Sequence, residues 1–219
     1  IFEEVDYDSS VVKHRLQELA YLNKGLKIVL IDDRDKKEDT FHYDGGIISY
    51  VEHLNKGKST LYVPPVYMSQ EKDNMFVEIA MQHCKEYYDE NVYSFVNCIN
   101  TKEGGTHMVG FKTALTRSLN NYARKNEILK AEESLSGDDV REGLTAVISV
   151  KVQDPQFEGQ TKAKLGNPEV RTAVDTVFGE YFYAFLEEHP REAEAILGKC
   201  LLAAEARRAA KQARETVLR

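Results

Sequence analysis

A run of polar and basic side chains follows the apolar segment 145–152 and ends just before a proline at position 168. Gln160 and Thr161 can donate hydrogen bonds there, and Lys162 and Lys164 carry positive charge. A lysine on a loop is a flexible point charge that suits contact with phosphate. Connections between a strand and a helix are usually short, and long ones tend to be functional or disordered. We therefore expect an anion contact here, although an ordinary surface lysine is the common alternative.

A second set of basic residues lies after Gly104 and Gly105. Apolar residues recur there at helical spacing, which predicts one long helix to about Arg124. The basic residues Lys112, Arg117 and Arg124 lie off the apolar stripe, and no acidic residue occurs between Gly104 and Lys125. A basic helix face can contact the phosphates of nucleic acid. The pattern alone favours the other interpretation, an ordinary solvated face.

Helices and strands alternate irregularly along the chain, without internal repeats. The patterns predict an α+β fold, with a mixed sheet and helices on one face. The predicted strands are 26–31, 40–43, 66–72, 76–83, 93–99 and 145–152. The predicted helices are 10–22, one opening after Gly46, 106–124, a short one at a capping box of Ser136 and Asp139, 168–188, and a long one from Arg191 to the end.

Composition sets further bounds. The 219 residues carry a net charge of -7, which argues against indiscriminate nucleic-acid binding, although a local basic surface can exist in an acidic chain. The cysteines Cys84, Cys98 and Cys200 are far apart and form no CxxC pair, so we expect free thiols in a reducing compartment and no metal site. No apolar run approaches the length of a membrane span. The chain opens at Ile1 without methionine, and we interpret it as a fragment or a processed product.

Several segments of the chain resemble the sequence of a known protein family. Gln160-Thr161-Lys162, after Asp154-Pro155-x-Phe157, resembles the segment just past the ATPase domain in the B subunits of type IIA topoisomerases, bacterial DNA gyrase and topoisomerase IV. Further segments agree in the same order along the whole chain: 19–25 (LAYLNKG), 43–47 (YDGGI), 103–107 (EGGTH), 110–117 (GFKTALTR) and 136–144 (SGDDVREGL).

The resemblance implies a fold and a division of the chain. It implies a transducer domain over 1–188, with the left-handed β-α-β fold found in domain two of ribosomal protein S-five. It also implies a C-terminal helix over 189–219 that leads toward a metal-binding cleavage domain. That helix carries a modest basic excess toward its end, which more often marks a helix packing on a neighbour than DNA binding: Arg207, Arg208, Lys211, Arg214 and Arg219.

The resemblance also implies roles for residues. Lys162 would reach the γ-phosphate of ATP held by the preceding domain, and Gln160 would contact the same phosphate end. Lys112, Arg117 and Arg124 would line the hole through which duplex DNA passes, touching phosphate rather than bases. We expect ATP and Mg²⁺ as cofactors of the intact enzyme, bound outside this chain, and no activity in the chain alone.

The same resemblance implies double-stranded DNA, the gyrase or topoisomerase IV A subunit and a second copy of the B subunit as partners, in the bacterial cytoplasm and nucleoid, with no membrane. The intact enzyme would couple ATP binding and hydrolysis to strand passage, for supercoiling or decatenation. Two alternatives from other classes stay open: a stand-alone nucleic-acid-binding module without ATP coupling, and a structural fragment whose last helix mediates oligomers.

Overall fold

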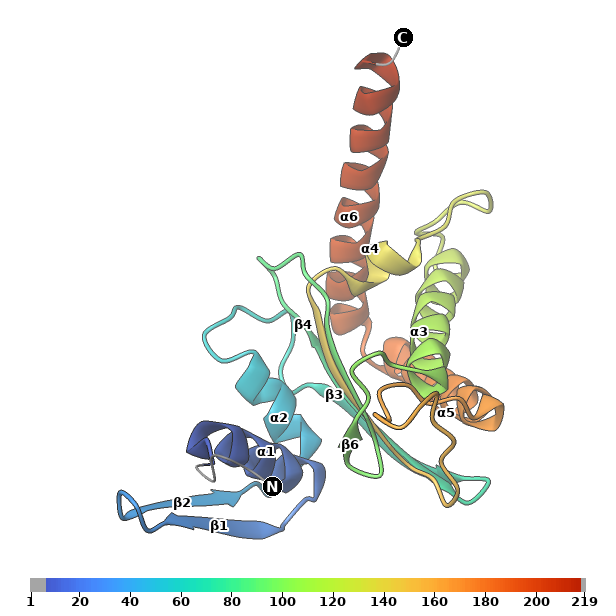
Figure 1. Cartoon of the computed structure of the whole chain (residues 1–219). Helices are drawn as coiled ribbons and strands as arrows, with labels where there is room; N and C mark the ends of the chain where they lie inside the picture. The colour runs from blue at the N-terminus through green and yellow to red at the C-terminus, as the bar shows by residue number, and fades with distance from the viewer. Residues whose placement is uncertain (1–6, 218–219) are drawn as a thin grey trace.

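The centre of the molecule is a five-stranded mixed sheet, seen in a computed structural model that describes residues 7–217 (Figure 1). β4 pairs antiparallel with β3 and with β7, whereas β5 runs parallel to β7, which confirms the predicted mixed sheet. The strand order across the sheet is β3 (Val66–Lys72), β4 (Met75–His83), β7 (Leu144–Lys151), β5 (Asn91–Val96) and β6 (Ile99–Asn100).

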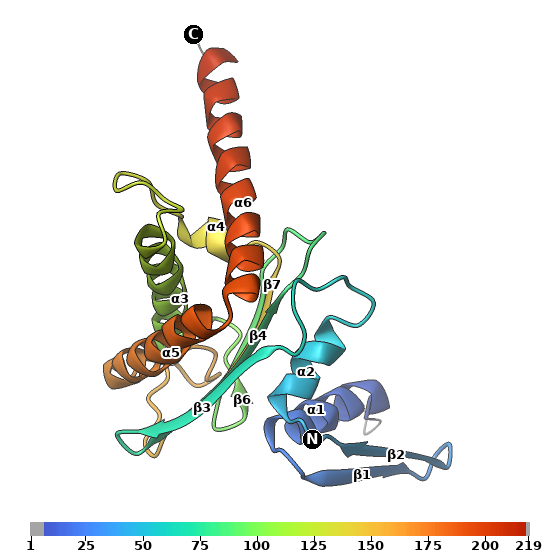
Figure 2. The same cartoon turned by 180° about the vertical axis from the view of Figure 1, so that it is seen from behind.

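Helices cover both faces of this sheet. α3 (Thr106–Lys125) and α5 (Pro168–Glu188) pack on one face, and α2 (Ile47–Leu54) packs on the other, as opposite views show (Figures 1 and 2). The prediction of helices on one face only is therefore wrong. Its physical reason is the continuous burial of β4 and β7, whose apolar side chains point to both sides and need cover on both.

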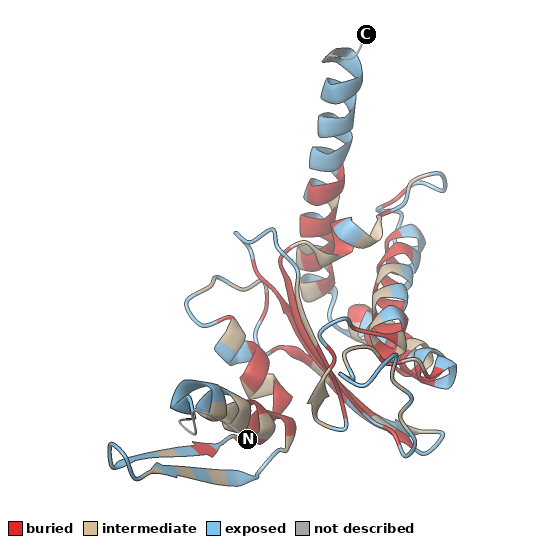
Figure 3. Cartoon of the chain, viewed as in Figure 1, coloured by how far each residue is buried: buried red, intermediate tan, exposed pale blue. Residues whose placement is uncertain are grey.

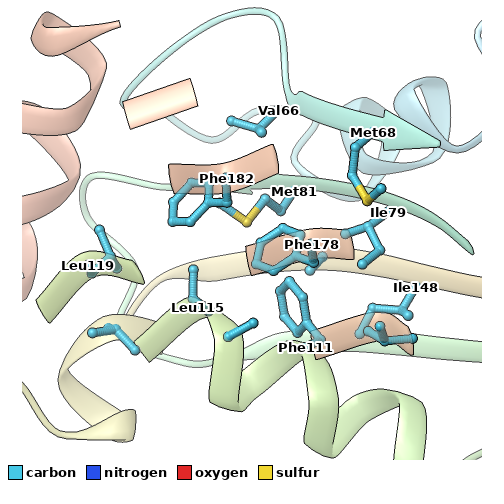
Figure 4. Packing of buried hydrophobic residues seen from close by; sticks show 14 of the residues in the cluster. Val66, Met68, Ile79, Met81, Phe111, Leu115, Leu119, Ile148, Phe178 and Phe182 are labelled. Atoms are coloured by element: carbon cyan, nitrogen blue, oxygen red, sulfur yellow. The ribbon is translucent and has the colours of Figure 1, made fainter. Parts of the chain in front are cut away.

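The larger core lies between the sheet and the pair α3–α5 (Figure 4). Phe111 of α3 and Phe178 of α5 meet with ring centroids 4.8 Å apart, and both are fully buried. Ile79, Met81 and Ile148 of the sheet lie against them. A buried side chain of this size contributes about 1.5–3 kcal/mol, so this layer fixes where α3 lies on the sheet.

A smaller layer covers the other face. Asp8 caps α1 (Ser9–Leu22) by accepting from the Ser10 backbone N–H at 2.8 Å. The predicted strands 26–31 and 40–43 correspond to β1 (Lys27–Asp32) and β2 (Lys37–His42), which pair antiparallel as a separate two-stranded sheet. Tyr21 of α1 stacks on Tyr50 of α2 at 4.7 Å, and this contact joins α1 to the layer over the sheet.

The end of β5 differs from the sequence prediction, whereas the start of α4 agrees with it. The predicted strand 93–99 is interrupted, because Asn97 and Cys98 take positive φ values of 48° and 65° and form a tight turn between β5 and β6. α4 (Gly137–Arg141) begins with the predicted capping box, in which the Ser136 side chain accepts from Asp139 N and the Asp139 side chain accepts from Ser136 N.

The last helix, α6 (Pro190–Val217), has two different halves (Figure 3). Its first half enters the main core through Ile196, Leu197 and Cys200, and its burial ends near Ala204. The half beyond Ala204 is exposed and projects from the domain. Arg207 donates two hydrogen bonds, of 2.8 and 2.9 Å, to the buried carboxylate of Asp139 in α4, and so fixes the helix where it leaves. The predicted domain boundary at 188 stays a prediction, and Arg219 lies outside the described residues.

Candidate functional site

The polar segment after β7 is an ordered hairpin rather than an irregular loop. Phe157 pairs antiparallel with Leu165, the Glu158 N–H donates to Lys164 O at 2.9 Å, and the Gly166 N–H donates to Gln156 O at 2.7 Å. We call residues 154–167 the Lys162 hairpin. Its tip, 159–163, carries the two residues expected at a phosphate, Gln160 and Lys162, and both are exposed.

One buried amide closes the base of the Lys162 hairpin. Asn167 is 2% exposed, and its Oδ1 accepts from the Gln156 N–H at 2.6 Å. Its Nδ2 donates to Asp154 O at 3.2 Å and to the Glu169 carboxylate at 2.7 Å. Sequence reasoning missed Asn167. The position before Pro168 at the start of a helix suggests a cap, but this side chain makes no capping hydrogen bond and instead turns back to the hairpin.

The second strand of the hairpin is tied to the start of α3. Three backbone hydrogen bonds make the tie: Glu103 N to Ala163 O at 3.0 Å, Leu165 N to Gly104 O at 3.1 Å, and Thr106 N to Leu165 O at 3.1 Å. Gly105 lies within this tie at φ +132°, and a Cβ there would lie 2.8 Å from Leu165 Cα and closer still to its backbone N and O. The hairpin and the first turn of α3 are therefore one connected unit.

Lys162 itself is free to reach outward. Its backbone takes φ +54°, an uncommon value for a residue with a side chain, and its N–H donates to Gly159 O at 3.2 Å. The ammonium lies 5.9 Å from the centre of the Phe157 ring, and no carboxylate within residues 7–217 forms an ion pair with it. Lys164, by contrast, pairs with Glu158 at 3.0 Å. The site thus presents one unpaired cation on a backbone held at its base and along one side.

The basic face of α3 is less purely basic than its own sequence predicts. Lys112 pairs with Glu90 at 2.5 Å, and Arg117 Nη1 reaches both carboxylate oxygens of Asp175, at 2.8 and 3.0 Å. Among the described residues, the partner of Arg124 is a backbone carbonyl, Glu133 O, which accepts from it at 3.3 Å. The acidic partners come from a loop and from α5, so no inspection of the helix alone reveals them. The predicted DNA-lining role of these residues stays a prediction.

Electrostatics around Glu90 follow from these pairs. Burial raises the pKa of Glu90, but the hydrogen bonds from Lys112 and Arg141 outweigh burial and hold the pKa below its usual range. The carboxylate is therefore charged at neutral pH. It neutralises part of the Lys112 charge that an approaching polyanion would meet.

Other groups with unusual chemistry lie inside the fold. His107, at the start of α3, is fully buried, and burial lowers its pKa to about 4. Its Nε2 lies 3.1 Å from Thr101 Oγ1, so it is a neutral packing residue near the hairpin.

All three cysteines are free thiols, as predicted. Within 7–217 there is no group of three or more metal-ligating side chains, and no helix is long and apolar enough to cross a membrane.

Comparison with known proteins gives consistent results. A family model described as DNA gyrase B matches residues 46–216. The B subunit of DNA gyrase from Halalkalibacterium halodurans is 53% identical over the whole chain, which spans 35% of that relative. The same subunit from Streptococcus pneumoniae is 54% identical over 98% of the chain, which spans 34% of it. The chain thus spans about a third of the length of these relatives.

Solved structures share the fold. The 43K ATPase domain of Thermus thermophilus gyrase B, in complex with an aminocoumarin, superposes with a TM-score of 0.87 at 42% identity, over 99% of this chain and 58% of that one. The topoisomerase IV ATP-binding domain of Francisella tularensis gives 0.81 at 27% identity, over 94% and 56%. The ATPase region of yeast topoisomerase II, at 16% identity and 0.56, shares the fold only. The mixed α+β fold is therefore that of ATPase-region structures, and this chain spans a little over half of the gyrase and topoisomerase IV ones.

Proposed function

We propose that this chain, which belongs to the DNA gyrase B family, is the transducer part of the ATPase region of a type II topoisomerase. In this proposal the rest of that region holds ATP and Mg²⁺, and the chain couples binding and hydrolysis to strand passage. Residues 1–188 form the transducer domain, and the unit β5–α3–β7 is the left-handed crossover of the family fold. Helix 189–219 continues toward a cleavage domain.

The observation that carries the proposal is the position of Lys162. It is an exposed cation at the tip of a hairpin that is held at both its base and its side, and it has no carboxylate partner within the described residues. A lysine that serves a surface ion-pair network pairs with a carboxylate of its own domain, as Lys164 does with Glu158. Lys162 and the neighbouring Gln160 are instead available to a phosphate bound by another module, and we assign them to the γ-phosphate of ATP.

The connection from this hairpin to α3 supplies the coupling route. When Lys162 moves toward or away from a γ-phosphate, the backbone tie at 103–106 moves the first turn of α3 with it. α3 carries Lys112, Arg117 and Arg124, which we propose line the DNA passage by contacting phosphates. One charge-assisted hydrogen bond contributes about 1.5–3 kcal/mol. Reversing a 1:99 equilibrium takes roughly 5.5 kcal/mol, so contacts between the two copies in a dimer must supply the remainder.

The partners follow from this assignment. We propose a dimer of the full-length protein around double-stranded DNA, acting with the A subunit of gyrase or topoisomerase IV in the bacterial cytoplasm. The chain alone lacks the nucleotide pocket in this scheme, so it neither hydrolyses ATP nor cuts DNA. Two of the three residues proposed to line the DNA passage, Lys112 and Arg117, are already paired with carboxylates, which predicts weak DNA binding by the isolated chain.

Lys162→Ala in the full-length protein tests the proposal. Loss of a hydrogen bond of about 1.5–3 kcal/mol to the transition state should lower the ATPase turnover number about 10- to 150-fold. The matched control is Lys164→Ala, two residues along the same hairpin, whose ammonium is engaged by Glu158. Steady-state ATPase assays should show near-normal turnover in the control, and unchanged thermal unfolding in both. Normal turnover in the Lys162 variant refutes the proposal.

A further inference from the structure

The position of Lys162 depends on how the hairpin is held, and one side chain holds its base. Asn167 links the two strands where they begin and end: its Oδ1 accepts from Gln156 N, and its Nδ2 donates to Asp154 O. The carboxamide of asparagine carries an acceptor oxygen and a donor nitrogen on separate atoms of one short, neutral side chain, so it can serve both positions at once. The Nδ2 bond to Glu169, at 2.7 Å, fixes which way the amide faces.

We infer that Asn167 is a positioning residue for Lys162, an inference that rests on the proposed function. The Asn167 side chain makes its hydrogen bonds at the hairpin base, and not at the tip 159–163, so it acts by keeping the hairpin closed with its tip pointing one way. Within the described residues, the other hydrogen bonds that join the two strands are two backbone ones, Glu158 N to Lys164 O and Gly166 N to Gln156 O, and the exposed side-chain pair of Lys164 and Glu158. A two-stranded ribbon this short is unstable unless its base is held.

The fold should survive loss of this amide. Asp154 and Gln156 are exposed residues, so water can replace the Asn167 side chain at the Asp154 carbonyl and the Gln156 N–H. The tie to α3 through 103–106 stays, because it uses backbone atoms only. The main consequence of Asn167→Ala is therefore a hairpin whose tip samples more directions, which lowers the fraction of time that Lys162 is in reach of a phosphate.

A double-mutant cycle in the full-length protein tests this inference. We expect Asn167→Ala to lower ATPase turnover about tenfold, because small misplacement of a catalytic group is costly. The loss cannot exceed that of Lys162→Ala if it acts only through Lys162. In the double variant, Asn167→Ala should then cause no further loss, whereas independent effects would multiply. Amide hydrogen exchange at Glu158 and Gly166 should become faster in Asn167→Ala, a change that loss of the Lys162 charge would not produce.

The control variant is Asn120→Ala. The Asn120 amide likewise closes a different loop, the one between α3 and α4: its Oδ1 accepts from Leu135 N at 2.9 Å, and its Nδ2 donates to Leu135 O at 3.1 Å. It should lower the melting temperature at least as much as Asn167→Ala while keeping turnover within about twofold of normal. If Asn167→Ala does not fold, the cycle is run with Asn167→Ser, which keeps a neutral hydroxyl at the position and adds no second carboxylate beside Glu169.

The outcomes separate the two proposals. If Lys162→Ala lowers turnover but Asn167→Ala does not, or if the two losses multiply, the positioning role of Asn167 is refuted and the proposed function stands. If Lys162→Ala leaves turnover unchanged, the proposed function fails whatever Asn167→Ala does. A turnover loss in Asn167→Ala that disappears in the Lys162→Ala background supports both.

Discussion

Gly105 offers the sharpest test of the tie between the Lys162 hairpin and α3. Its φ of +132° is a conformation that side chains disfavour, and a Cβ would lie 2.8 Å from Leu165 Cα, inside normal contact distance. Gly105→Ala therefore adds two separate penalties, one from the backbone conformation and one from the collision with the Leu165 backbone. That backbone cannot move aside without breaking hydrogen bonds to Gly104 and Thr106.

The size of each penalty can be worked out. The unfavourable φ costs about 1–3 kcal/mol. Losing the two hydrogen bonds, Leu165 N to Gly104 O and Thr106 N to Leu165 O, costs about 0.5–1.5 kcal/mol each. Together they predict a loss of about 2–6 kcal/mol in the free energy of unfolding, measured by urea denaturation of the chain.

Gly159→Ala is the matched control, because it separates the two penalties. Gly159 lies at the tip of the same hairpin with φ +108°, and an added Cβ would meet nothing within 4 Å. The control should therefore lose only the conformational part, about 1–3 kcal/mol. Equal unfolding free energies for the two variants would refute the claim that the hairpin packs closely on the start of α3.

Two further predictions concern charge. Burial lowers the pKa of His83 to about 4, below its unfolded value of about 6.5, so the unfolded state binds the proton first. Stability should fall by roughly 3 kcal/mol as the pH drops from about 6.5 to about 4, and urea midpoints across that range should fall less steeply in His83→Gln. An unchanged slope would contradict this. Asp175→Asn should free Arg117 and steepen the salt dependence of DNA affinity by about one ion per new phosphate contact, measured by fluorescence anisotropy. An unaltered slope would exclude Arg117 from the DNA surface.

Local patterns predicted most of the elements. The apolar stripe after Gly105 specified α3, the capping box at Ser136 specified the start of α4, and Pro168 marked the first residue of α5, because each signal lies within a few residues of what it determines. The turn at Asn97 was missed, since two residues with positive φ follow an apolar run that looks continuous.

The parts of the site that the sequence did not predict are held by long-range or backbone contacts. Asp175 is 58 residues from Arg117, so the spacing of residues along one helix could not predict this ion pair. The Lys162 hairpin is built from backbone hydrogen bonds, which leave no side-chain periodicity to read. The role of Asn167 could not be predicted either, because its amide joins residues 11 and 13 positions away, and these lie near it only once the hairpin has formed.

The two halves of α6 have a mechanical consequence. A helix embedded along its first four turns and clamped by Arg207 rotates rigidly with the domain, so its free end magnifies any tilt of the sheet and helices. At 1.5 Å of rise per residue, the stretch from Glu205 to Val217 is an arm of about 20 Å, and a tilt of about 10° would sweep its end through roughly 3–4 Å. A displacement of that size is comparable to the width of a side chain, large enough to change which groups meet at whatever surface the arm touches.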